Sequence, residues 1–226
     1  MLRKPALPTP CLALITDRSL CPGGTLVRKV SEAVEAGVDL VQLREKDLGD
    51  SQLLTLARDL REVIGGRALL LINGRADIAR AAGADGVHLP EKEGSVADVR
   101  RIIGDDALIG RSVHSVAGVL LAQREGADYA QLGSIYPTRS HPGVTPIGAA
   151  AIPETAQSLS IPILAVGGID AERVQDVIKG GAHGVAVVSA ILSAVSAADA
   201  ARKLRSALDV AWIKREATAG KATKSS

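Results

Sequence analysis

The chain contains almost no aromatic residues. Its 226 residues include one Trp, two Tyr and no Phe, although hydrophobic residues make up 46% of the sequence. Ala, Val, Ile and Leu must therefore fill the core through many small contacts. Because a β-sandwich usually has more aromatic and Thr-rich strands, this shortage favours an α/β protein.

Cysteines and long apolar runs are also scarce. Cys11 and Cys21 are the only cysteines. They are too few for a disulfide scaffold and lack metal-site spacing, so we expect reduced thiols in a cytoplasmic protein. No stretch is apolar for long enough to cross a membrane. Pro8 and Pro10 interrupt the N-terminal apolar run, which therefore lacks the form of a signal peptide.

The chain has no strong charge of either sign. It carries 27 basic and 25 acidic residues, and the slight positive excess lies in the segment from Lys214. Nucleic-acid binding needs basic residues clustered on the folded part, so we predict neither a nucleic-acid nor a membrane partner. We expect one domain over residues 1–213 and a disordered basic tail over 214–226.

Short apolar runs alternate along the chain with longer amphipathic segments. The expected strands are 12–16, 40–43, 68–72, 86–89, 107–109, 129–132, 163–166 and 184–188. The expected helices are 27–36, 52–64, 78–82, 96–103, 116–123, 149–158, 171–179 and 190–208. Eight buried strands, each followed by a helix, predict a single-domain (β/α)8 TIM barrel. A doubly wound open sheet is the alternative.

A short motif recurs where an expected helix ends and a strand begins. It reads Gly37-Val38-Asp39, Gly83-Ala84-Asp85 and Gly126-Ala127-Asp128, with Gly181-Ala182-His183 as a fourth copy. Gly suits the left-handed position just past a helix end. We therefore expect these glycines to be structural and assign them no chemistry.

One polar segment follows the expected fifth strand: Gly110-Arg111-Ser112-Val113-His114-Ser115. The carboxyl ends of barrel strands are where catalysis takes place. A histidine titrates near neutral pH and can take and give a proton. His114 is therefore the candidate catalytic residue, and a histidine that closes a turn or caps the next helix is the alternative.

Glycines follow the seventh expected strand, and a short helical segment follows the eighth. The loops after these two strands often bind a phosphate in TIM barrels, because backbone N–H groups approach the anion closely there. We expect Gly167, Gly168, Val188 and Ser189 to form a phosphate site. Two ordinary tight turns are the alternative.

Further polar residues follow other strands. Gln42, Arg44 and Lys46 share one direction because side chains alternate along a strand. A buried Arg needs an anionic partner: either a ligand, or a structural carboxylate at Glu45 or Asp17. Asn73 ends the third strand. The 134–147 loop, which contains Thr138, Ser140 and His141, has the composition of an active-site lid or of a surface loop.

Together these segments resemble the thiamine phosphate synthase/TenI family. The resemblance covers nearly all of the chain except its C-terminal segment. The motifs that carry it are Thr16-Asp17, 42–46, 83–89, 110–114, 136–138, 166–169 and 184–190. The family implies one of two reactions. The synthase joins a pyrimidine diphosphate to a thiazole phosphate with magnesium, whereas thiazole tautomerases of the TenI branch aromatise a carboxylated dihydrothiazole phosphate by moving a proton.

The two branches of the family differ at the residues that hold the metal. The synthase typically has Asn-Asp after the third strand, and the Asp holds magnesium; this chain has Asn73-Gly74. The second metal carboxylate aligns near Glu93, and His141 replaces a lysine. These departures favour a thiazole tautomerase with His114 as the proton carrier and no metal or other cofactor.

The tautomerase interpretation implies a small phosphorylated thiazole as the partner and leaves a homo-oligomer open. Its expected substrate-binding residues are Gln42, Arg44, Lys46, Asn73, Ser112, Thr138, Ser140 and His141. One alternative is thiamine phosphate synthase, with Glu93 as the remaining magnesium ligand. The other is a non-catalytic regulatory protein that binds a thiazole phosphate.

Overall fold

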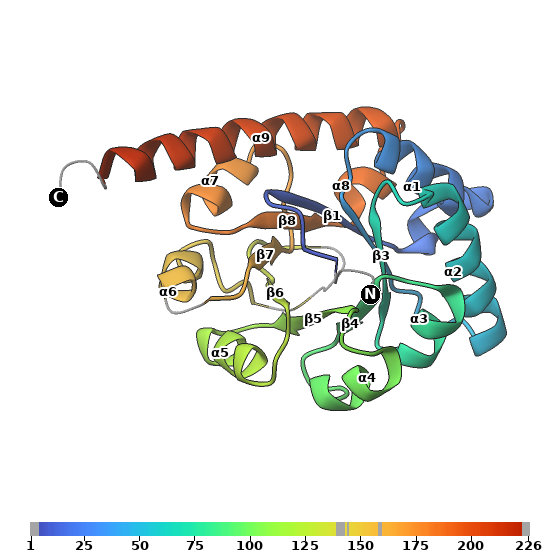
Figure 1. Ribbon diagram of the computed structural model, residues 1–226. Coiled ribbons are helices and arrows are strands. Elements are labelled where there is room, and N and C mark those ends of the chain that lie inside the picture. Colours follow the sequence, from blue (N-terminus) through green and yellow to red (C-terminus); the bar gives the residue numbers. More distant parts are fainter. Residues whose placement is uncertain (1–4, 139–142, 144, 158–159, 223–226) are drawn as a thin grey trace.

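Eight apolar runs form one closed parallel barrel in the computed structural model, which describes residues 5–138, 143, 145–157 and 160–222 (Figure 1). The strands are β1 (Cys11–Ile15), β2 (Leu40–Leu43), β3 (Leu69–Asn73), β4 (Gly86–Leu89), β5 (Leu108–Val113), β6 (Tyr129–Leu132), β7 (Ile163–Val166) and β8 (Gly184–Val187). Each strand pairs with the next, and β8 pairs with β1. The TIM-barrel prediction is confirmed, and the open-sheet alternative is wrong.

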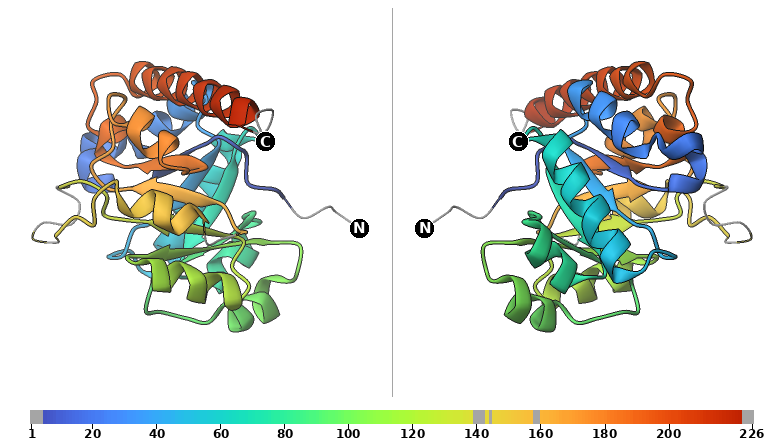
Figure 2. Two further views of the ribbon diagram at one scale, coloured as in Figure 1. Left: turned by 90° about the vertical axis from the view of Figure 1, so that its left-hand side faces the viewer. Right: turned by 90° about the vertical axis from the view of Figure 1, so that its right-hand side faces the viewer.

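Helices surround the barrel on its outer face (Figures 1 and 2). They are α1 (Leu26–Glu35), α2 (Asp50–Ile64), α3 (Ala76–Ala82), α4 (Val96–Ile103), α5 (Val116–Arg124), α6 (Ala151–Gln157), α7 (Val174–Lys179), α8 (Ser189–Leu192) and α9 (Ala197–Ala222). Two short 3-10 helices, η1 (Arg18–Leu20) and η2 (Pro22–Gly24), precede α1. No helix within the described ranges is long and apolar enough to cross a membrane.

The core has two layers because side chains alternate between the two faces of each strand. The larger layer lies between the strands and the helices. The smaller layer fills the barrel interior: Cys11, Ala13, Ile15, Leu40, Leu71, Leu108, Tyr129, Leu164 and Ala186. Tyr129 is the one aromatic ring in this interior cluster. A Cβ on Gly110 would lie 2.2 Å from that ring, so only glycine leaves room for Tyr129.

Strand β5 is longer than its apolar run predicts. Gly110–Val113, which we expected beyond the strand, pairs with Tyr129–Leu132 of β6. The glycine and the polar residues end the apolar pattern, but the backbone hydrogen bonds to β6 continue past it. As a result, Ser112 is part of β5 and its side chain faces the barrel interior, where it contacts β4.

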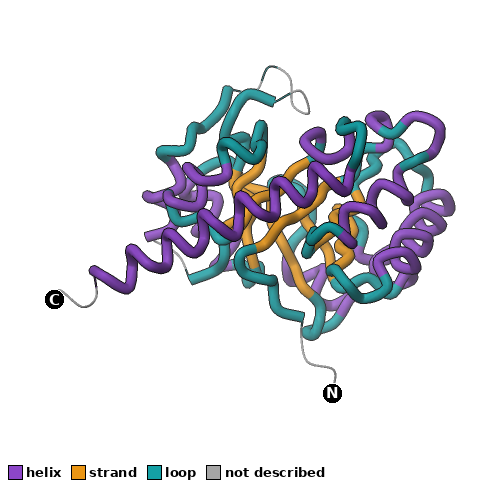
Figure 3. The backbone as a smooth tube through the Cα atoms, turned by 90° about the horizontal axis from the view of Figure 1, so that it is seen from above, coloured by secondary structure: helices purple, strands orange, loops and turns teal. Residues whose placement is uncertain are grey.

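The C-terminal segment also differs from the prediction. We expected one helix over 190–208 and a disordered tail from 214, but α8 and α9 are separate helices and α9 continues to Ala222. Helix α9 packs against α1 and α7, and its far end extends beyond the barrel (Figure 3). Arg215 donates to the Ala182 carbonyl at 2.8 Å and lies 3.8 Å from the centre of the Trp212 ring. These contacts hold the start of the segment from 214 on the barrel.

The recurring Gly-x-Asp motif joins the strands in pairs at the amino-terminal end of the barrel. In three copies one Asp oxygen accepts two hydrogen bonds, from the backbone N–H of the preceding strand and from an Arg: Asp39 with Leu12 and Arg205, Asp85 with Leu70 and Arg61, Asp128 with Ile109 and Arg100. In the fourth copy His183 Nδ1 accepts from the Ile163 N–H at 3.3 Å. The motif is therefore structural.

Replacing one of these carboxylates should destabilise the fold. In Asp85→Ala the buried N–H of Leu70 loses its 2.7 Å acceptor and Arg61 loses its ion-pair partner. An unsatisfied buried donor costs about 1–3 kcal/mol, so we expect a loss of about 2 kcal/mol in the free energy of unfolding, measured by urea denaturation. Asp85→Asn keeps an acceptor oxygen and should lose less. The exposed Asp106→Ala is the control, and an equal loss there would contradict the assignment.

Candidate active site

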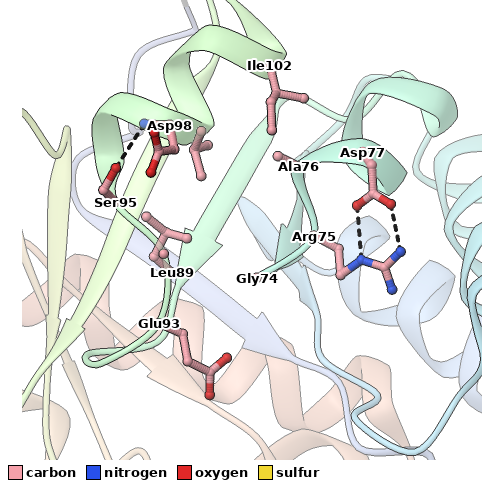
Figure 4. Close-up of a pocket in the computed structure, with 11 residues that line it drawn as sticks. Gly74, Arg75, Ala76, Asp77, Leu89, Glu93, Ser95, Asp98 and Ile102 are labelled. Carbon is pink, nitrogen blue, oxygen red and sulfur yellow. Dashed lines mark hydrogen bonds and ion pairs between the residues drawn. The ribbon is translucent and has the colours of Figure 1, made fainter.

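Two adjoining cavities lie where β2, β3 and β4 end. One has a volume of about 270 Å³ and is bordered by Lys46, Asn73, Gly74, Arg75 and Glu93 among others. The other, of about 290 Å³, shares Gly74, Arg75 and Glu93 and extends between α3 and α4. Figure 4 shows Glu93 across from Gly74, with Arg75 turned toward Asp77. The cavities lie at the carboxyl ends of the strands, as expected for a barrel enzyme.

A chain of amide side chains crosses the barrel interior beside the first cavity. Gln131 Nε2 donates to Gln42 Oε1 at 3.0 Å, and Gln42 Nε2 donates to Asn73 Oδ1 at 3.1 Å. Gln42 and Gln131 are each 2% exposed. These hydrogen bonds bring two of the predicted substrate-binding residues, Gln42 and Asn73, together. The three amide side chains form an uncharged polar surface, which we call the amide floor.

A second polar chain crosses the interior from β6 to β5. His88 Nδ1 lies 3.0 Å from the Tyr129 hydroxyl, and His88 Nε2 lies 2.8 Å from Ser112 Oγ. His88 and Tyr129 are fully buried. Burial, followed by the positive charges of Arg111 and Arg44, lowers the pKa of His88 to about 3. The imidazole is therefore neutral at neutral pH.

The two cations that follow β2 have no anionic partner in the part of the chain that the structure describes. Glu45 accepts from the backbone N–H of Arg18, and Asp17 accepts from the backbone N–H and hydroxyl of Ser19. Within the described ranges, neither the Arg44 guanidinium nor the Lys46 ammonium has a hydrogen-bond or ion-pair partner. Arg44 is half-buried and Lys46 is exposed. Their positive charge is thus available for an anionic ligand.

The predicted phosphate loops lie after β7 and β8. Gly167 and Gly168 have φ values of 99° and 63°. A Cβ on Gly168 would lie 2.5 Å from the Pro137 carbonyl oxygen, so the glycine also permits close approach of the loop after β6. Val188 precedes the first residue of α8, Ser189. The N–H groups of Ile191 and Leu192 donate to the Val188 carbonyl, so the N–H groups of Ser189 and Ala190 are the ones that a helix leaves without an acceptor at its start.

The loop after β6 begins against the phosphate loop. Arg173 lies 4.8 Å from the centre of the Tyr136 ring and donates to the Gly168 carbonyl at 2.6 Å. Thr138 is half-buried. Ser140 and His141 lie outside the described residues, so their predicted roles stay predictions.

His114 lies between the end of β5 and the start of α5. Its ring is about half exposed (51%), and Nδ1 lies 3.0 Å from Glu91 Oε2. The His114 backbone N–H donates to Glu91 Oε1, and Ser115 caps α5 by accepting from the Gly118 N–H. These contacts join His114 to the loop after β4, and its catalytic role stays a prediction.

Three polar residues of the interior were not among the predicted site residues: His88, Tyr129 and Gln131. Each lies within an apolar run, where a polar residue does not reveal which face it occupies. Spacing along the strand is one available signal, because side chains two residues apart point to the same face. His88 therefore shares the interior face with Gly86, and Gln131 shares it with Tyr129. Their contacts to other strands appear only in the tertiary structure.

A magnesium ion would find few protein ligands here. No group of three or more His, Cys, Asp or Glu able to hold a metal occurs in the part of the chain that the structure describes. Glu93 borders both cavities, and within the same part its carboxylate has no hydrogen-bond or ion-pair partner. Because Mg²⁺ is often held by one or two carboxylates plus substrate phosphates, the residues fit an ion that a diphosphate brings with it.

The position of Glu93 is set by Arg111. The Arg111 guanidinium lies on the outer side of β5 and donates to the carbonyls of Pro90, Glu93 and Gly94 at 2.9–3.0 Å. It also pairs with Glu125. The loop that carries Glu93 is therefore held by a buried charge.

Comparisons with known proteins point to one family. Residues 12–191 match the family model described as thiamine monophosphate synthase. The chain is 42% identical over 183 residues to the thiamine-phosphate synthase of Clostridium botulinum, covering 80% of this chain and 89% of that protein. For the enzyme of the same name from Methanoculleus marisnigri, the identity is 42% over 196 residues, which cover 86% and 93% of the two chains.

A solved structure agrees with these relatives. The thiamine phosphate pyrophosphorylase of Pyrococcus furiosus superposes with a TM-score of 0.81 at 33% identity, covering 89% of this chain and 96% of that one. A 3-hexulose-6-phosphate synthase is also similar, with a TM-score of 0.67, but at 18% identity it supports the barrel fold alone.

Proposed function

This chain belongs to the thiamine monophosphate synthase family, and we propose that it joins a pyrimidine diphosphate to a thiazole phosphate and releases diphosphate. The observation that carries the proposal is the pair of cations after β2, Arg44 and Lys46, which have no anionic partner among the described residues. Lys46 borders the same cavity as Asn73 of the uncharged amide floor. A substrate with a neutral ring and a charged diphosphate matches both halves of that arrangement. The relatives' shared name supports the same reaction.

The tautomerase prediction is wrong. Relatives at about 40% identity over four-fifths of the chain are named thiamine-phosphate synthase. The prediction depended on Gly74, which removes one metal carboxylate. One missing ligand does not exclude a magnesium-dependent reaction, because the diphosphate supplies oxygens of its own. The proton-carrier role of His114 was argued for the tautomerase; a catalytic role for His114 stays a prediction.

In the proposed reaction the residues of the chain bind, orient and balance charge. The bond from the pyrimidine to its diphosphate breaks as the bond to the thiazole forms, so negative charge builds up on the leaving diphosphate. Arg44 and Lys46 would stabilise that charge. Gly167, Gly168 and Ser189 would hold the thiazole phosphate through backbone N–H groups.

Magnesium would supply further neutralisation of the diphosphate when bound. Glu93 and Asn73 are the residues that would hold it. A cytoplasmic location and a homo-oligomeric state stay predictions.

Purified protein should form thiamine phosphate from the pyrimidine diphosphate and thiazole phosphate when magnesium is present. Glu93→Gln should raise the magnesium concentration for half-maximal rate about tenfold, since loss of a contact of about 1.4 kcal/mol corresponds to that factor. Glu91→Gln is the matched control, because Glu91 is engaged by His114, and it should leave the magnesium dependence unchanged. Absence of product, or binding of thiazole phosphate without turnover, would contradict the proposal.

A further inference from the structure

Each nitrogen of the His88 ring has one partner in the barrel interior. Nδ1 faces the Tyr129 hydroxyl at 3.0 Å, and Nε2 faces Ser112 Oγ at 2.8 Å. His88 is 0% exposed and neutral at neutral pH. A neutral imidazole carries a proton on one nitrogen only, and the other nitrogen accepts. The direction of one of these hydrogen bonds therefore determines the direction of the other.

Tyr129 determines that direction. Its side chain is 0% exposed and its ring fills the space above Gly110. Burial raises the pKa of the phenol, so the hydroxyl keeps its proton. Among the described residues, His88 Nδ1 is the one hydrogen-bond partner of this hydroxyl. Buried donors in native proteins are paired, so the phenol donates to Nδ1. The opposite direction would leave the phenol proton without an acceptor.

The remaining proton of the imidazole then lies on Nε2. This N–H donates to Ser112 Oγ, whose own hydroxyl proton is left free. Ser112 is partly exposed and stands opposite Gln131 in the register of β5 and β6, next to the amide floor. We propose that His88 and Tyr129 are positioning residues that make Ser112 a hydrogen-bond donor toward the substrate, so that the site selects a ring nitrogen without a proton.

The uncharged surroundings favour a ring nitrogen as the acceptor. Ser112 stands opposite Gln131, which donates to Gln42. Arg44 and Lys46, which have no anionic partner among the described residues and suit a phosphate, lie instead beyond the end of β2. This assignment rests on the proposed function, because it identifies the ring as that of the pyrimidine diphosphate. The hydrogen-bond direction itself does not depend on the reaction.

Nitrogen-15 NMR of the imidazoles tests the direction in the unliganded protein. We expect His88 to carry its proton on Nε2 and none on Nδ1 at neutral pH, and its signals are identified by their loss in His88→Gln. A proton on Nδ1, or a doubly protonated ring, would overturn the inference whatever the protein catalyses.

Calorimetric binding of the pyrimidine diphosphate tests the role of Ser112. In His88→Gln the new amide nitrogen can occupy the place of Nε2 and donate to Ser112, whereas the shorter Asn reaches only the place of Nδ1. We expect Ser112→Ala and His88→Asn each to weaken binding about tenfold. The variant that combines the two substitutions should bind no more weakly than Ser112→Ala alone, because the two residues act as one unit. His88→Gln should restore binding to within about threefold.

Inorganic diphosphate distinguishes the possible acceptors. Its dissociation constant should be the same in the wild type and in all four variants; an equal loss for both ligands would assign Ser112 to a phosphate oxygen and overturn the ring-nitrogen assignment. Unchanged binding of the pyrimidine compound in His88→Asn, with an unchanged melting temperature, would overturn the positioning role. Failure of the wild type to bind it, with the expected Nε2 proton present, would instead contradict the proposed function.

Discussion

Arg44→Met should reduce kcat/KM for the pyrimidine diphosphate by about 100-fold or more. Arg44 is half-buried, and no carboxylate within the described residues pairs with it, so its charge is free to balance the leaving diphosphate. Removing one preorganised donor at a developing negative charge typically costs about 10²–10³ in rate. Steady-state kinetics at saturating magnesium would measure the loss. Lys46→Met should have a smaller effect because Lys46 is exposed and water screens its charge.

Arg58→Met is the matched control. Arg58 is an exposed arginine of α2 on the outer side of the barrel, and its replacement should leave kcat/KM unchanged. The melting temperature of each variant separates a loss of function from a loss of fold. An Arg44→Met enzyme with wild-type kcat/KM would remove the main support for a diphosphate site after β2.

The folded protein should lose stability below pH 6.5 in a way that depends on His88. Burial, and secondarily Arg111 and Arg44, lower the folded-state pKa of His88 to about 3, whereas a histidine in an unfolded chain titrates near 6.5. Between these values the unfolded state binds the extra proton. The stabilising contribution is therefore complete above about pH 6.5 and falls by about 1.4 kcal/mol per pH unit as the pH drops.

Urea denaturation at several pH values would measure this effect. At pH 4.5 the wild type should have lost about 2–3 kcal/mol through His88 alone. His88→Gln removes that titration, so its free energy of unfolding should fall less steeply between pH 6.5 and 4.5. The slope is the measured quantity, so a constant loss of stability in the variant does not disturb the comparison. Parallel curves for the two proteins would contradict the buried, neutral His88.

Much of the fold is predictable from local pattern. The strands 40–43, 86–89, 129–132 and 163–166 have the predicted limits, because each is a short apolar run with a turn on both sides. The parity of side chains along β2 also places Gln42 in the barrel interior, as its contacts to Asn73 and Gln131 show. Pattern fails where composition and hydrogen bonding disagree, as at the end of β5.

The C-terminal segment also shows that local pattern does not predict every element. Its Ala, Lys and Thr residues are compatible with a frayed chain, and nothing local marks a helix to Ala222. The helix is supported by contacts with α1 and α7 and by the hydrogen bond from Arg215 to the Ala182 carbonyl. All of these partners belong to other parts of the chain. A helix supported by such packing is not visible in its own composition.

The sequence by itself determined the eight-stranded barrel, the Gly-x-Asp repeats and the polar residues that follow β2, because these depend on spacing along one strand or one turn. Only the tertiary structure decided which polar residues meet. The contacts from Tyr129 to His88, from His88 to Ser112 and from Gln131 to Gln42 join residues 41, 24 and 89 positions apart. Closure of the barrel brings them together, and burial then keeps His88 neutral and each of its hydrogen bonds in one direction.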